Sequence, residues 1–295
     1  MTVITRTLTL PGLGPIDVTA DDQGEGRPFL LLHGGGGPQT VAGFAELLAT
    51  HGPARVITPA HPGFGGTPRP DGLTSMAGLA ALYRELLERL GLPDVTVIGN
   101  SIGGWIAAEL ALLGTARISG LVLVDAVGIE VDEHPVTDIF PLGLDELARL
   151  SYHDPAAFRI DPAAMTEAQR AGLAANRAAL RVYGGARMAD PGLYGRLAAI
   201  ACPTLVIWGE ADRIVDPGYG RAYAAAIPGA ASRCCVAPGI SRSLRPRGSS
   251  CGRYGTSPWL PPPASTRKTR AAPVPWLPPV PGLPRNPGTR PASRE

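Results

Sequence analysis

One short segment of this chain combines residue types that could do chemistry, a serine set between glycines in the sequence GNSIG at residues 99–103. It follows the apolar, β-branched residues 95–98 and precedes the apolar helical run 105–113. This order predicts a strand, a sharp turn and a helix, with Ser101 at the apex and its hydroxyl exposed. The flanking glycines let the backbone turn tightly and let the helix approach the strand. We therefore predict that Ser101 is a nucleophile that attacks a carbonyl carbon.

Alternating strands and helices must position this serine. Short apolar runs predict strands that are buried on both faces, as in a parallel sheet, and helical periodicity separates these runs. The fold class is therefore α/β, with a doubly wound, mostly parallel sheet. We predict strands over residues 4–10, 16–19, 29–33, 55–58, 95–99, 121–125 and 204–208, and helices over 41–51, 76–91, 103–113 and 217–227.

The alternation of strands and helices stops in the middle of the chain. Residues 128–196 hold helix-like pieces at 144–150 and 166–182, which are separated by proline- and aspartate-rich starts. We predict that 128–196 is a helical cap, or lid, that covers the carboxyl ends of the strands. The core then consists of residues 1–127 and 197–230.

The last part of the chain, residues 231–295, differs in composition from the rest. It holds eleven basic side chains and one acidic side chain, Glu295, a formal charge of +10 that leaves −8 on residues 1–230. It also holds 14 of the 32 prolines and shows neither helical period nor strand alternation. Such a segment cannot bury enough apolar surface to offset its loss of conformational entropy. We predict a disordered tail over 231–295, with the last strand and helix of the core missing.

Four motifs occur in a characteristic order. HGGGGP at 33–38 follows the third predicted strand, HPGFG at 61–65 follows the fourth, GNSIG follows the fifth, and WGEADR at 208–213 follows the seventh. With these motifs the chain resembles the α/β-hydrolase fold family over residues 1–230.

The resemblance implies a role for each candidate site residue. Ser101 matches the nucleophile, and the N–H groups of Gly35 and Ile102 match the oxyanion hole that stabilises charge on the substrate oxygen. Asp212 matches the acid that orients an imidazole. Asp125, at the end of the sixth strand, is an alternative acid, although a strand-end cap fits its context better. His33 and His61 are implied to be structural rings that bind neighbouring loops.

The base that such a serine requires is missing from the sequence. In the family it is a histidine after the last strand, but no histidine follows His153, and arginine stays protonated and cannot replace it. A shift of reading frame explains the loss. When the third base of each codon from Ala230 onward is joined to the first two bases of the next, the genetic code permits RFxVLxxAGHLP, a strand followed by a Gly-His loop. We interpret the tail as frameshifted near residues 229–231.

We therefore expect a serine-type hydrolase of carboxylic esters or related acyl and carbonyl substrates that acts through an acyl-enzyme and is impaired in this chain. One alternative is a hydrolase of carbon–carbon bonds in ring-fission products, which GNSIGG and the glycine loop also resemble. Another is a non-catalytic binding protein with this fold, which the missing base supports.

The expected partner is a small-molecule substrate, with no cofactor and no metal, and the oligomeric state stays open. The aromatic residues of the basic tail are too sparse to predict specific nucleic-acid binding. The chain shows no signal-peptide pattern and no apolar run long enough to span a membrane, so we expect a cytoplasmic protein without membrane contact.

Overall fold

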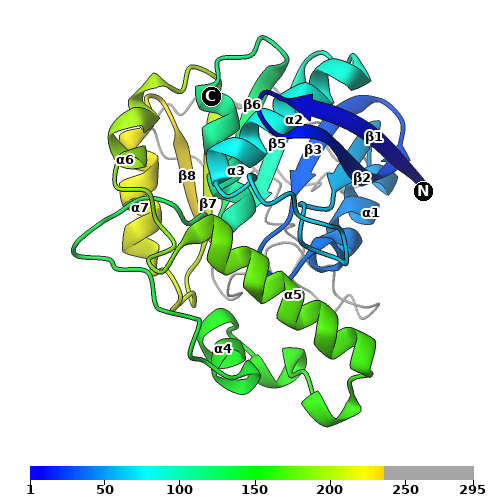
Figure 1. Ribbon diagram of the computed structural model, residues 1–295. Coiled ribbons are helices and arrows are strands. Elements are labelled where there is room, and N and C mark those ends of the chain that lie inside the picture. Colours follow the sequence, from blue (N-terminus) through cyan, green and yellow to red (C-terminus); the bar gives the residue numbers. More distant parts are fainter. Residues whose placement is uncertain (236–295) are drawn as a thin grey trace, which may run out of the picture.

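Within residues 1–235, which the computed structural model describes, eight strands form one sheet in the order β1-β2-β4-β3-β5-β6-β7-β8 (Figure 1). β2 pairs antiparallel with β1 and β4, and every other pair is parallel. The strands are β1 (Thr2–Leu10), β2 (Gly14–Gly24), β3 (Arg27–Leu32), β4 (Ala54–Pro59), β5 (Val95–Asn100), β6 (Ile118–Val124), β7 (Thr204–Gly209) and β8 (Ala231–Cys235). The α-helices are α1 (Ala42–Thr50), α2 (Met76–Leu90), α3 (Ile102–Leu112), α4 (Leu144–Ser151), α5 (Glu167–Gly184), α6 (Leu193–Arg196) and α7 (Pro217–Ala226). This architecture confirms the predicted α/β class.

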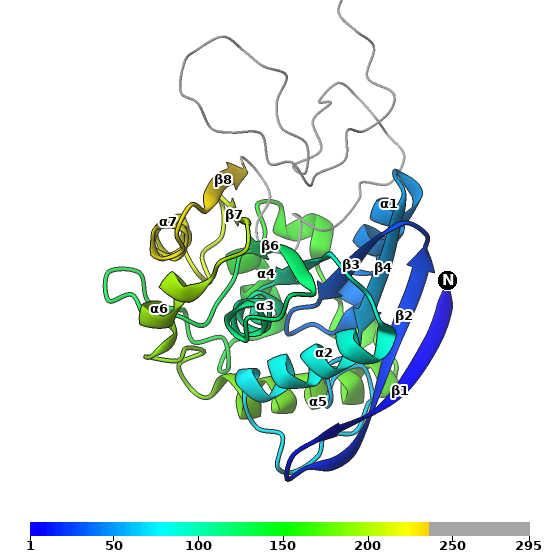
Figure 2. The same cartoon turned by 90° about the horizontal axis from the view of Figure 1, so that it is seen from above.

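Helices cover both faces of the sheet. α1 lies on one face, and α2, α3 and α7 lie on the other (Figure 2). Successive residues of a strand therefore point into different apolar cores. In β3, Leu30 and Leu32 belong to the larger core with α2 and α3, whereas Phe29 and Leu31 pack with Phe44 of α1. This alternation is the reason why the central strands are apolar runs, as the sequence predicts.

Capping residues explain where two of the helices begin and end. At the start of α2, the Ser75 hydroxyl accepts a hydrogen bond from the N–H of Gly78 at 3.1 Å, and Gly91 ends the helix in the left-handed conformation. α5 begins with a reciprocal capping box between Thr166 and Gln169. The sequence thus fixes the residue at which α5 begins.

The insertion predicted between β6 and β7 contains α4, α5 and α6. Figure 1 shows α4 and α5, in green, outside the sheet and its flanking helices. The two ends of the insertion meet, because Gly128 and Ala189 form a parallel bridge and the N–H of Asp190 donates to the carbonyl of Gly128 at 2.8 Å. The boundaries at 128 and 196 remain predictions.

A strand at Ala231–Cys235 corrects the prediction that the last strand is missing and that the tail begins unstructured at 231. β8 pairs in parallel with β7, from Leu205 opposite Ala231 to Gly209 opposite Cys235. Pairing of this kind uses backbone groups, so the free edge of β7 can order a segment without an apolar pattern. β8 is largely exposed, whereas every residue of β7 is buried. The rest of the predicted tail, residues 236–295, and the missing last helix lie outside the described residues.

Candidate active site

Ser101 sits at the junction of β5 and α3 in a strained backbone conformation, with φ 56° and ψ −118°. The neighbouring glycines are a steric requirement. A Cβ on Gly99 would lie 2.2 Å from the carbonyl oxygen of Gly103, and a Cβ on Gly103 would lie 2.3 Å from that of Leu32. The turn therefore needs glycine on both sides of the serine. Ser101 is half-buried, and its hydroxyl makes no hydrogen bond within residues 1–235.

The glycine loop after β3 lies beside the serine. A Cβ on Gly34 would be 3.2 Å from the Cβ of Ser101 and 3.0 Å from Oδ1 of Asn100. Among the described residues, the N–H groups of Gly35 and Ile102 find no acceptor. The N–H of Ile102 also opens α3, where the helix dipole favours negative charge. Both donors that the sequence suggests are thus free within that part of the chain.

The peptide that carries the Gly35 N–H is held by its carbonyl end. The oxygen of Gly34 accepts hydrogen bonds from Nδ1 of His33 at 2.7 Å and from the N–H of Gly37 at 3.1 Å. Because a trans peptide is planar, with its N–H opposite its C=O, fixing this oxygen also fixes the direction of the Gly35 N–H. His33 thus orients the loop through a backbone atom.

A second buried histidine holds His33 in place. The N–H of His61 donates to Nε2 of His33 at 3.1 Å, so the proton of His33 lies on Nδ1. Nε2 of His61 donates to the carbonyl of His33 at 3.0 Å, and Nδ1 of His61 accepts from the hydroxyl of Tyr83 on α2. The two rings stack with centroids 3.7 Å apart. Every ring nitrogen of this group has a partner.

Burial keeps both imidazoles neutral. It lowers the pKa of His33 to about 4. Burial and then the neighbouring His33 lower the pKa of His61 well below 6.5. The two rings are therefore fixed hydrogen-bonding groups, in agreement with the structural role that the resemblance implies. The sequence gives no sign of Tyr83, because its partner lies 22 residues earlier in the chain.

Asp212 lies in the turn after β7 and is buried. Its Oδ1 accepts hydrogen bonds from the N–H groups of Ile214 and Val215 at 2.8 and 3.1 Å. Its Oδ2 is buried and has no partner within residues 1–235. Burial and then the charge of Asp125 raise the pKa of Asp212 well above its usual value. This carboxyl thus presents one oxygen to which no described group donates a hydrogen bond.

Asp125, the alternative acid, serves the strand end. It follows β6 with φ 46°, and its Oδ1 accepts from the N–H of Gly209 at 2.7 Å. The carboxylate thereby ties the end of β6 to the end of β7. This geometry is that of a strand-end cap.

None of the five histidines, all of which lie in the described part of the chain, bonds to Ser101 or Asp212. His51 ends α1, and His153 is exposed in the insertion. His134 is half-buried. Its Nδ1 lies 2.9 Å from Oδ2 of Asp216, the N-cap of α7.

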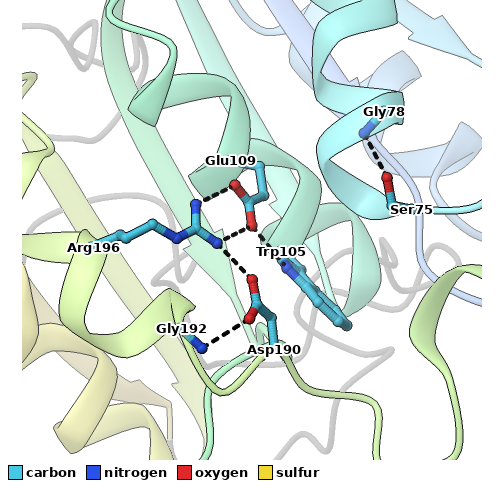
Figure 3. A network of polar contacts seen from close by, with 7 residues as sticks. All are labelled: Ser75, Gly78, Trp105, Glu109, Asp190, Gly192 and Arg196. Atoms are coloured by element: carbon cyan, nitrogen blue, oxygen red, sulfur yellow. Dashed lines mark hydrogen bonds and ion pairs between the residues drawn. The ribbon is translucent and has the colours of Figure 1, made fainter.

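The sequence analysis did not predict an ion network in which Glu109 is buried and Arg196 and Asp190 are partly exposed. Glu109 of α3 is buried and accepts hydrogen bonds from both terminal nitrogens of Arg196 at 2.7 Å, and Arg196 also contacts Asp190 at 2.6 Å (Figure 3). The network ties α3 to the returning end of the insertion. A surface cavity of about 570 Å³ lies beside it and is not lined by Ser101. The signal in the sequence is one acidic residue within the apolar run 105–113.

Within residues 1–235, no group of three histidine, cysteine or acidic side chains is arranged to hold a metal ion. In the same part of the chain, we find no helix with both the length and the apolar character that a membrane span requires.

Comparisons with known proteins agree with this fold. Residues 29–239 match the model of the alpha/beta hydrolase family. The chain is 41% identical over 114 residues to a 2-hydroxymuconate semialdehyde hydrolase of Pseudomonas putida, a match that covers 37% of this chain and 39% of the relative. It is 27% identical over 223 residues to a 2-hydroxy-6-oxo-6-(2'-aminophenyl)hexa-2,4-dienoic acid hydrolase of Metapseudomonas resinovorans, with 68% of this chain and 73% of the relative covered. The first match thus spans about two fifths of the relative's length.

Among solved structures, a thermophilic esterase from Thermogutta terrifontis superposes with a TM-score of 0.65 at 25% identity. The superposition covers 83% of this chain and 93% of the esterase.

Proposed function

Because this chain belongs to the alpha/beta hydrolase family, we propose that its site is built for acyl transfer to water with Ser101 as the nucleophile. The observation that carries the proposal is the pairing of a strained serine turn with a glycine loop in contact with it. In the reaction, Oγ of Ser101 attacks the substrate carbonyl and its proton passes to a base. The substrate oxygen becomes an oxyanion.

The free N–H groups of Gly35 and Ile102 are proposed to receive this oxyanion. Each such donor contributes about 3 kcal/mol to stabilising the transition state, because it is oriented before the reaction begins. When the oxyanion collapses, the bond to the leaving group breaks, the leaving group departs with the proton held by the base, and an acyl-enzyme remains. Water then attacks the acyl carbon, the acid product is released, and Ser101 recovers its proton.

The base is proposed to be absent from this chain, so that the site is incomplete. Two observations support this. None of the five histidines, all within the described residues, bonds to Ser101, and Oδ2 of Asp212 has no partner there, although an imidazole N–H would satisfy it. Loss of one member of a catalytic triad typically lowers kcat by about 10⁴- to 10⁶-fold. We therefore propose that this chain hydrolyses its substrate only at a residual rate.

The proposed cause is a shifted reading frame from about residue 230. The exposure of Ser232, Arg233 and Cys234 in β8 supports it, since the shifted reading permits an apolar strand at the same place. The test is the nucleotide sequence around codon 230, followed by expression of the product of the shifted frame. We expect an open frame that encodes a Gly-His loop about ten residues on, and a kcat for p-nitrophenyl esters at least about 10⁴-fold above that of the present chain.

The matched control is the shifted-frame product with the restored histidine replaced by alanine, which is expected to return to the rate of the present chain. An early stop codon in the shifted frame would contradict the proposal. Equal turnover by the present chain and the shifted-frame product would do so too.

A second candidate activity is hydrolysis of a carbon–carbon bond in a ring-fission product. The names of the two bacterial relatives favour it, since both are hydrolases of 2-hydroxy-dienoic or muconic compounds. The shifted-frame product distinguishes the two candidates when an aryl ester and a 2-hydroxy-6-oxo-dienoate are compared by kcat/KM. Tight binding of either compound without turnover would favour a non-catalytic binding protein.

A further inference from the structure

The helix α5 of the insertion lies against both loops that flank the candidate site. Four residues form one face of the helix at helical spacing, and all are buried: Asn176, Ala179, Leu180 and Tyr183. This face covers the loop after β3 and the loop after β4. The hydroxyl of Tyr183 donates to the carbonyl of Pro62 at 3.0 Å. Further hydrogen bonds of this face are made by the side-chain amide of Asn176.

Asn176 joins the two loops through its side-chain amide. Its Nδ2 donates to the carbonyl of Gly36 at 3.1 Å, and its Oδ1 accepts from the N–H of Gly65 at 3.0 Å. One partner needs a donor and the other an acceptor, so the orientation of the amide is fixed. The two loops lie 140 and 111 residues from Asn176 in the chain, so only tertiary packing can bring this amide between them.

The glycine loop depends on such contacts because it has no side chains of its own between residues 34 and 37. Gly35 lies between two carbonyls that are both held. The oxygen of Gly34 is held from the core by His33 and Gly37, and the oxygen of Gly36 is held by Asn176 and by Gln39. Gln39 acts from an exposed position, whereas Asn176 is buried and out of competition with water.

We propose that Asn176 is a positioning residue for the glycine loop, and that the loop keeps its working geometry only while α5 is seated on it. The inference rests on the proposed function, in which the N–H of Gly35 is an oxyanion donor. When α5 lifts away, the carbonyl of Gly36 and the N–H of Gly65 lose their buried partner together. Packing of α5 on the two loops and orientation of the Gly35 N–H then occur together.

The first test follows amide hydrogen exchange in the full chain. Asn176→Leu removes both hydrogen bonds with little change in volume, and Ala178→Leu is the control on the exposed side of the same helix. The reporters are the N–H groups of Gly37 and Thr40, which bond to carbonyls within the loop and not to Asn176. We expect exchange at these amides to rise about tenfold in Asn176→Leu, with exchange along α5 unchanged and Ala178→Leu like the native chain.

Two results would overturn the inference. One is unchanged exchange at Gly37 and Thr40. The other is faster exchange along α5 to the same extent, because that would mean that the substitution simply loosens the helix.

The second test separates positioning from binding. Asn176→Asp keeps the acceptor for Gly65 and loses the donor to Gly36. In single-turnover reactions of the shifted-frame product with a p-nitrophenyl ester, we expect Asn176→Asp to slow Ser101 acylation by about tenfold with KM within about twofold. A rise in KM at an unchanged rate would count against a positioning role. If the shifted-frame product shows no acylation that depends on Ser101, the proposed function fails, and the exchange experiment still decides the role of Asn176.

Discussion

The two sides of the candidate site differ in how completely their buried titratable side chains are hydrogen-bonded, although the hydroxyls of Thr58 in β4 and Thr96 in β5 also lack a partner in the described residues. On the side of β3, β4 and β5, each ring nitrogen of His33 and His61 has a partner, and the glycine loop is held from the core and from α5. On the side of β7 and β8, Oδ2 of Asp212 is buried without a partner in the described residues. Asp212 also lies beside a second carboxyl, that of Asp125.

The two sides of the site come from different parts of the sequence. The complete side is built from residues before 130 and from the insertion, where the sequence carries three of the four family motifs. The incomplete side depends on residues beyond 212. A buried acceptor without a donor is costly and is rare in native proteins. The contrast therefore favours a role for Oδ2 of Asp212 as the acceptor of a hydrogen bond from a residue further along the chain.

The largest expected effect tests whether Ser101 catalyses hydrolysis when the side of the site that holds Asp212 is incomplete. In the shifted-frame product, Ser101→Ala is expected to lower kcat for an aryl ester by about 10⁴-fold or more. In the present chain the same substitution is expected to change the residual rate by less than about tenfold, because members of one catalytic unit are not additive. Steady-state hydrolysis of the four proteins measures this. A large loss in the present chain would mean that Ser101 already has a base.

The next largest effect compares the two sides of the site through the pH dependence of the free energy of unfolding. The pKa of His33 falls from 6.5 to about 4 on folding, so between these values the unfolded chain binds more protons. The free energy of unfolding is therefore expected to fall on acidification from pH 6.5 towards 4, by up to about 1.4 kcal/mol per pH unit for each buried histidine. Above pH 6.5 these rings contribute no slope.

Asp212 acts in the opposite direction, because its folded pKa is raised. Its contribution is present at low pH and is lost as pH rises from its ordinary value of 3.8 towards the folded one. Urea unfolding of the native chain and of Asp212→Asn, from pH 5 to 6.5, separates the two. The slope of stability with pH is expected to be steeper in the variant. An equal slope would mean that the folded pKa of Asp212 does not rise into this pH range.

The sequence predicts the part of this architecture that depends on local pattern. Apolar runs locate the central strands because those strands are buried on both faces, and the GNSIG turn locates Ser101 because the backbone there tolerates only glycine at 99 and 103. It does not predict β8, since SRC at 232–234 carries no strand pattern and the edge of β7 supplies the pairing. It also misses Tyr83 and Asn176, because their partners are brought near by tertiary packing.

The smallest expected effect concerns Asp212 itself. Asp212→Asn keeps Oδ1 for the N–H groups of Ile214 and Val215 and removes a charge that Asp125 opposes. In the present chain we therefore expect a change in unfolding free energy within about 1 kcal/mol near neutral pH and no change in residual esterase rate, because there is no imidazole to orient. In the shifted-frame product the same substitution is expected to lower kcat by about 10⁴-fold. A loss of similar size in both proteins would show that Asp212 acts on a group other than a restored histidine, and the two sides of the site would then be complete in this chain as it stands.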